Sequence, residues 1–164
     1  MHSLFSLFAF AFCIADAGKH YLRHSPVVVA NNSLVLYTQS NYTGTQVCSS
    51  AGALAKNFVA TISNDAPAQG EQVTTTFDFD LDAPIVGGTA YYSATLNGLG
   101  PFTSSAPLCD ETAKTGDPCP LGVGHHRQES TTKNSVTGKV VTRITWEDPA
   151  GSEILCVVLT TKST

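Results

Sequence analysis

The clearest structural signal in the sequence is a strict alternation of side chains from Val73 to Leu81. Successive side chains of a β-strand point to opposite faces, so this pattern predicts a half-buried strand. The mainly apolar face would carry Val73, Thr75, Phe77, Phe79 and Leu81. The polar face would carry Thr74, Thr76, Asp78 and Asp80.

Similar alternation recurs along the chain and predicts further strands at residues 58–62, 90–99 and 139–147. A last strand at 153–160 is apolar on both faces, which predicts a central, covered position. Asp148-Pro149-Ala150-Gly151 has the residues of a tight turn. Short strands separated by turns predict an all-β fold, an antiparallel β-sandwich or barrel.

Two segments are predicted to lie outside the strands. Gly100-Pro101 predicts a turn, and residues 104–127 predict a loop because they hold several Gly and Pro residues. No stretch after residue 17 has a convincing helical period. Within the predicted loop, His125 and His126 are expected to form an exposed pair rather than a metal site.

The N-terminal segment has the pattern of a secretory signal peptide. An apolar run from Leu4 to Ile14 precedes Ala15-Asp16-Ala17, an A-x-A cleavage pattern, so residues 1–17 are expected to be removed. A retained anchor is the alternative. Residues 18–47 are expected to form an N-terminal arm, a pro-segment or an extra edge strand, and residues 48–164 the folded domain.

The cysteines agree with an oxidising compartment. Cys13 would leave with the signal peptide, and the four that remain imply two disulfides. Three connectivities are possible; the one with the local pair Cys109 and Cys119 leaves Cys48 and Cys156 as a long closure. A zinc site is disfavoured because no C-x2-C spacing is present. Sequons at Asn31 and Asn41 are candidate N-glycosylation sites in a secreted or lumenal protein.

Composition and motifs exclude several functions. The net charge is −4 and no stripe of Lys or Arg is present, which disfavours a nucleic-acid-binding surface. The sequence has no G-x-S-x-G, H-E-x-x-H, G-x-G-x-x-G or P-loop motif. Asp78, Asp80 and Asp82 are expected to be a solvated strand face, because the spacing is not that of an EF-hand. We therefore expect no enzyme, no cofactor and no metal.

Unusually large apolar residues occupy the predicted inward faces. They are Phe58, Phe77, Phe79, Tyr92, Leu96, Phe102, Ile144 and Trp146. A closed sandwich core is one interpretation of this set. The other is an apolar slot between splayed sheets, which would hold a lipid tail by burial at about 0.8 kcal/mol per CH₂ group.

Four segments in order resemble the MD-2-related lipid-recognition (ML) domain family. Residues 62–70 (ISNDAPAQG) resemble its I-S-P-D-P-P-x-x-G turn, and residues 88–99 resemble its G-A-y-v strand with the following glycine. Residues 108–124, which include LCDE and CPLGVG, resemble its D-L-C…C-P-L-x-x-G block. Residues 146–156 resemble the closing strand, turn and strand that end in cysteine.

The resemblance implies an Ig-like β-sandwich with an apolar lipid slot between its two sheets. It also implies that Cys48 pairs with Cys156 and that Cys109 pairs with Cys119, and it implies no catalytic residue. The expected function is that of a monomeric lipid-binding and transfer protein that contacts membranes transiently. The ligand would be a phospholipid of the phosphatidylglycerol or phosphatidylinositol type, or a sterol. Alternatives are intracellular sterol transport of the Niemann-Pick type C2 kind, or a secreted module that presents a lipid to a receptor.

Overall fold

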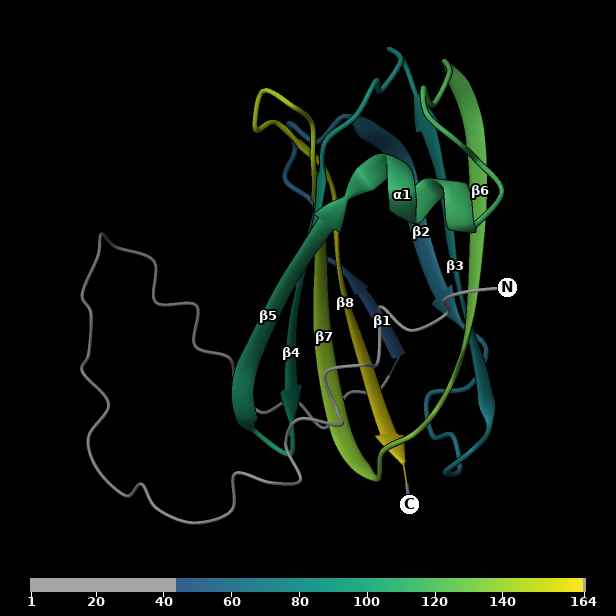
Figure 1. The fold of residues 1–164 in the computed structure, drawn as a ribbon, viewed down its shortest axis with the longest axis vertical. Helices are drawn as coiled ribbons and strands as arrows, with labels where there is room; N and C mark the ends of the chain where they lie inside the picture. The colour runs from purple at the N-terminus through teal and green to yellow at the C-terminus, as the bar shows by residue number, and fades with distance from the viewer. Residues whose placement is uncertain (1–43, 164) are drawn as a thin grey trace, which may run out of the picture. The chain divides into compact units, whose positions relative to one another are not determined.

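The computed structural model describes residues 44–163 and shows two facing β-sheets and one short helix (Figure 1). The expected signal peptide, both sequons and residues 18–43 lie outside the described residues. The elements are β1 (Gly44–Val47), β2 (Ala55–Ile62), β3 (Gln72–Leu81), β4 (Thr89–Leu96), β5 (Leu99–Pro107), α1 (Leu108–Lys114), β6 (Gly124–Lys133), β7 (Gly138–Glu147) and β8 (Glu153–Ser163). The predicted antiparallel β-sandwich is confirmed.

Neighbouring strands are antiparallel in both sheets. One sheet has five strands in the order β1-β8-β7-β4-β5, and the other has three in the order β2-β3-β6. The predicted alternation of β3 is observed, since Phe77, Phe79 and Leu81 are buried and Asp78 and Asp80 are partly exposed. β1 pairs with β8 as an edge strand, so the sheet begins four residues before Cys48.

Two predictions about the middle of the chain are wrong. Gly100-Pro101 lies within β5, and the turn is instead at Asn97 and Gly98, which both have positive φ. Residues 104–127 are not a loop, because they contain the end of β5, all of α1 and the start of β6. The seven-residue helix is too short for an apolar period to stand out in the sequence.

The two sheets are joined along β1, β2 and β8. Thr45 Oγ1 donates to the carbonyl of Ala60 at 2.7 Å, which links β1 to β2. The backbone N–H of Lys162, in β8, donates to the carbonyl of Asp65 in the loop after β2 at 2.8 Å. β2, β1 and β8 lie close to one another here, whereas β5 and β6 are the outer strands of their sheets on the other side.

The ends of the sandwich differ in their connections. We call the end with α1 and residues 82–88, 115–123 and 148–152 the helix end, and the end with residues 63–71, 97–98 and 134–137 the hairpin end (Figure 1). Both disulfides implied by the resemblance are present, Cys48–Cys156 and Cys109–Cys119. Cys109 and Cys119 tie α1 to the loop that follows it, at the helix end.

A buried asparagine holds one side of the hairpin end. The side-chain amide of Asn134, which is 6% exposed, donates to the carbonyl of Ala68 at 3.1 Å and to Ser163 Oγ at 3.0 Å. Its backbone also exchanges hydrogen bonds with Gly70 and Glu71. These contacts fasten the loop before β7 to the loop before β3 and to the end of β8.

Among residues 44–163, no helix is long and apolar enough to cross a bilayer.

Candidate functional site

Four of the eight predicted inward residues form an aromatic cluster between the sheets. The Phe58 ring lies 5.5 Å from Phe77 and 6.4 Å from Phe79, and the Trp146 ring lies 5.7 Å from Phe77 and 6.1 Å from Phe79, all in edge-to-face arrangements. Phe79 is 1% exposed and Trp146 4%. The cluster joins β2 and β3 of one sheet to β7 of the other, and it belongs to the hydrophobic core.

The other four predicted residues lie on the five-stranded sheet. Tyr92 and Leu96 are on β4 and Phe102 is on β5, and all three are only partly buried. Ile144 on β7 is 5% exposed and pairs with Tyr92. We use the name β4–β5 wall for the inward-facing, half-buried residues of these two strands: Tyr92, Ala94, Leu96, Phe102, Ser104 and Ala106.

Burial changes along β7 and β8, two central strands of the five-stranded sheet. On β7 the inward side chains of Trp146 and Ile144 are buried, whereas Thr142 and Val140, nearer the hairpin end, are partly exposed. On β8 Leu155 and Val157 are fully buried and Leu159 is partly exposed. Inward side chains of a sealed core would all be buried, so the packing is complete toward the helix end and incomplete beside the β4–β5 wall.

The inward face of β6 is polar, and the sequence pattern did not predict it. His126, Gln128, Ser130 and Thr132 pair with Phe79, Phe77, Thr75 and Val73 of β3, and therefore share their face. His125, Arg127 and Glu129 alternate with them on the outside and are exposed. The period of two was visible in the sequence, but an inward row without an apolar residue gave no core signal.

A buried carboxylate on α1 contacts the β4–β5 wall. Tyr92 Oη donates to Glu111 Oε2 at 3.0 Å, and Lys114 Nζ lies 2.6 Å from Glu111 Oε1. Glu111 is 8% exposed, so both of its oxygens are satisfied inside the protein. Burial, together with the neighbouring Glu111 carboxylate, raises the pKa of Tyr92 well above its usual value. The phenol therefore remains a hydrogen-bond donor at physiological pH.

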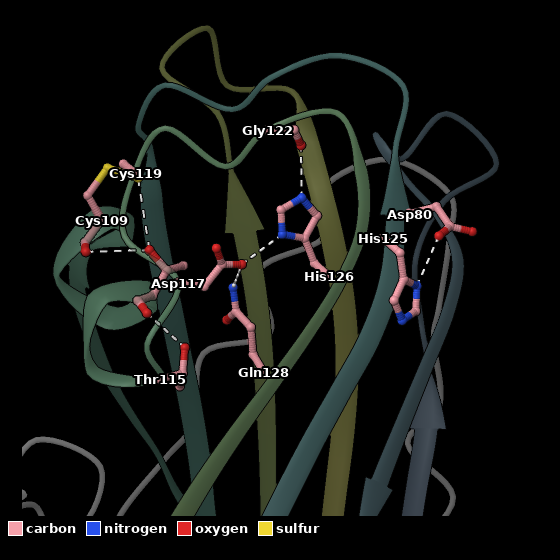
Figure 2. A network of polar contacts seen from close by, with 10 residues as sticks. Asp80, Cys109, Thr115, Asp117, Cys119, Gly122, His125, His126 and Gln128 are labelled. Carbon is pink, nitrogen blue, oxygen red and sulfur yellow. Dashed lines mark hydrogen bonds and ion pairs between the residues drawn. A yellow bond between two sulfur atoms is a disulfide. The ribbon is translucent and has the colours of Figure 1, made fainter.

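His126 holds the loop that follows α1 against the three-stranded sheet (Figure 2). Its Nδ1 lies 2.7 Å from Asp117 Oδ2 and its Nε2 lies 2.8 Å from the carbonyl oxygen of Gly122. Both partners are acceptors, so a ring nitrogen of His126 that carries a proton has an acceptor within hydrogen-bond distance. The ring also stacks on Phe79, with centroids 5.4 Å apart, and Gln128 donates to the same Asp117 oxygen at 3.3 Å.

The prediction of an exposed histidine pair in a loop is therefore wrong. Both residues lie on β6, and adjacent side chains of a strand point to opposite faces. His126 points inward, where its side chain is 10% exposed, while His125 lies outside, 3.1 Å from Asp80 (Figure 2). Hydrogen bonds from Asn57 and His125 lower the pKa of Asp80. Among residues 44–163, no group of three or more side chains is arranged to hold a metal ion.

This arrangement defines the class of fold: an antiparallel sandwich of five and three strands with an apolar interior and two disulfides. No family model matches the chain, and no curated protein matches it in sequence. Among solved structures, it is similar to a Niemann-Pick type C2 protein from the Japanese carpenter ant. That likeness has 14% identity and a TM-score of 0.54, and it covers 73% of this chain and 98% of that one.

The chain is also similar in structure to chicken MD-1, which was solved in complex with lipid IVa. The identity is 16% and the TM-score 0.52, with 72% of this chain and 86% of that chain covered. These likenesses show the fold. The chain has the fold of these two proteins, which is the fold that its motifs predict.

Proposed function

We propose that this protein binds a single lipid between its two sheets and carries it between membranes in a secreted or lumenal compartment. The observation that carries the proposal is the half-buried β4–β5 wall: Tyr92, Leu96 and Phe102 face inward but are only partly buried, whereas Ile144 and Trp146 on the neighbouring strand β7 are buried. A lipid's apolar part laid against this wall would complete the burial of these side chains. The folds of the ant protein and of chicken MD-1, the latter complexed with a lipid, support it.

The charges near the interior bear on the choice of lipid. No lysine or arginine occupies an inward position on the described strands, and Lys114 of α1 already pairs with Glu111. A buried phosphate would need such a partner. A phospholipid of the phosphatidylglycerol or phosphatidylinositol type would therefore keep its headgroup outside the sheets. A sterol, which is uncharged, could enter completely.

The test is lipid transfer between vesicles with a matched pair of variants. The purified protein should accelerate the movement of labelled phosphatidylglycerol or labelled cholesterol, and native mass spectrometry should find one lipid per chain, chemically unchanged. Phe102→Asp should abolish transfer, because it places a carboxylate on the wall. Thr103→Asp, the next residue on the exposed face of β5, should transfer normally.

Two outcomes would refute the proposal: transfer of neither lipid by the unmodified protein, or equal transfer by both variants. Accumulation of hydrolysis products in proportion to protein would indicate an enzyme instead.

A lipid-presenting recognition module is the second candidate. It is favoured by two exposed valines at the helix end, Val86 and Val123, which are 70% and 66% exposed. They lie in the two segments joined by the bridge between Ile85 and Leu121. If presentation to a receptor is the function, the protein should bind lipid stably yet release it slowly to vesicles, and Val86→Asp should leave lipid binding intact.

A further inference from the structure

The single tryptophan of the chain has a buried polar group that no described residue satisfies. Trp146 Nε1 is buried and has no hydrogen-bond partner in the described part of the protein. Tryptophan N–H groups usually find a partner when they are buried, since an unsatisfied donor carries a desolvation penalty. Trp146 is 4% exposed, so water outside the protein does not reach the group freely.

The surroundings of Trp146 offer aromatic faces rather than oxygen atoms. Phe77 and Phe79 meet the indole at interplanar angles of 66° and 87°. An aromatic face accepts an N–H only weakly compared with a carbonyl or hydroxyl oxygen. The cross-strand neighbours of Trp146, which are Ala90 on β4 and Leu155 on β8, have apolar side chains. The N–H of Trp146 is therefore a polar group among apolar side chains.

The position of Trp146 relates it to the proposed lipid site. It pairs with Ala90, and the next inward pairs toward the hairpin end are Ile144 with Tyr92, Thr142 with Ala94 and Val140 with Leu96. The indole thus lies at the packed end of the row whose other end is the β4–β5 wall. Six residues separate Trp146 from Val140, which corresponds to about 20 Å of strand.

We propose that the site takes a lipid with a neutral acceptor oxygen, such as a ketone, ester or hydroxyl oxygen, at the end that enters deepest, and that Trp146 Nε1 donates to it. This inference rests on the proposed lipid-binding function and adds a preference for lipids that carry an oxygen acceptor at the buried end. A plain hydrocarbon end that reached the indole would leave the donor unsatisfied. An oxygen at that end is matched by the indole, which can only donate.

The experiment compares matched fatty acids on the purified protein. Saturated acids of twelve to eighteen carbons are each paired with the analogue that carries a ketone at the penultimate carbon, so that the series scans the depth of the site. At the length that reaches Trp146, we expect the keto acid to bind about fivefold more tightly than its parent acid. The dissociation constants are measured by titration calorimetry.

Because the chain has one tryptophan, its indole gives a single ¹H–¹⁵N cross-peak that reports on this hydrogen bond. The peak should move downfield with the keto acid and not with the parent acid. Trp146→Phe should bring the ratio of the two dissociation constants close to one. Replacement of Trp146 by benzothienylalanine, which keeps the bicyclic shape but lacks the N–H, should do the same and covers the case in which Trp146→Phe does not fold.

Three results separate this inference from the proposed function. If no acid, sterol or phospholipid binds, the lipid-binding function itself fails. If parent acids bind and no keto analogue binds more tightly at any length, the selection by Trp146 is wrong. Tighter binding of the keto acid that persists in both Trp146 replacements also overturns it. So does an indole proton signal that keeps the same high-field position with both ligands, since that position would place the N–H on a phenylalanine ring.

Discussion

The helix end and the hairpin end of the sandwich are built from the same strands, yet they are packed to different extents. At the helix end Leu81, Leu108, Leu121 and Leu155 are at most 2% exposed. On the β4–β5 wall, toward the hairpin end, Leu96 and Phe102 remain partly exposed although they face inward. Residue type alone does not explain the difference, because leucine is fully buried in one region, at Leu81, and partly exposed in the other, at Leu96.

The difference lies in what crosses between the sheets. The helix end has α1, the Cys109–Cys119 disulfide and the contacts of His126 with Asp117 and Gly122. The hairpin end has a comparable clamp, at Asn134, on its β2 and β8 side. One region of the sandwich is thus locked by covalent and polar contacts, while the β4–β5 wall, where we propose that the lipid binds, stays half-buried.

The largest effect should come from the long disulfide. Replacing Cys48 and Cys156 by alanine opens a closure of 108 positions, and in the chain-entropy model such a closure contributes roughly 4.7 kcal/mol. Replacing Cys109 and Cys119, which are ten positions apart, should cost roughly 3 kcal/mol or less. Urea unfolding of both double variants measures the two values. Equal losses would mean that loop length does not set the contribution of these disulfides.

Phe79→Ala tests the sealed region. Phe79 contacts Phe58, Trp146 and His126 and is 1% exposed, so its truncation should lower the free energy of unfolding by about 3–5 kcal/mol. The measurement is made on delipidated protein, so that a bound ligand does not add to the stability. A loss below about 1.5 kcal/mol is smaller than a core truncation gives. It would place Phe79 in an open part of the interior and contradict the difference in packing between the helix end and the β4–β5 wall.

His126→Phe tests the polar contacts that hold the helix end closed. Phenylalanine keeps a ring against Phe79 but removes both ring nitrogens, so Gly122 loses its contact and Asp117 keeps only that of Gln128, which should cost about 1–3 kcal/mol. His125→Phe is the control on the opposite face, where we expect a change within about 0.5 kcal/mol. Thermal unfolding at one fixed pH compares the two. If the control loses as much, the contacts of His126 are not responsible.

The smallest change in stability and the clearest change in binding should come from Phe102→Ala. The ring is partly exposed, so we expect a loss of about 1 kcal/mol in the free energy of unfolding of the lipid-free protein. Affinity for lipid should fall roughly tenfold, because the ligand loses an apolar contact. Thr103→Ala on the exposed face should change neither quantity. A core-sized loss of stability with unchanged affinity would move the lipid site away from this wall.

Several parts of the fold could be predicted from the sequence because they depend on local chemistry. The alternation from Val73 to Leu81 specifies a strand with two different faces, since successive side chains point in opposite directions. The turn at residues 148–151 follows from the conformations that Pro and Gly prefer, and Asp148 Oδ1 accepts from the N–H of Ala150 and of Ser152. The resemblance to the ML family added the disulfide pairing.

Other features needed the tertiary structure. The α1 helix is only seven residues long, and the Gly and Pro residues around it predicted a loop instead. The structure shows that Cys109 and Cys119 tie this helix to the loop that follows it. The inward position of His126 and Gln128 depends on their pairing with Phe79 and Phe77 of β3. Neither relation is encoded by neighbouring residues alone.

The sequence by itself determined which residues face inward: of the eight predicted positions, Phe77, Phe79, Ile144 and Trp146 are buried and Phe58, Tyr92, Leu96 and Phe102 are partly buried. Only the tertiary structure decided that the first group packs in the core while Tyr92, Leu96 and Phe102 line a half-buried wall. The physical reason is that the direction of a side chain follows from the period of its own strand. The completeness of its burial depends instead on the second sheet, which is made of residues distant in the sequence.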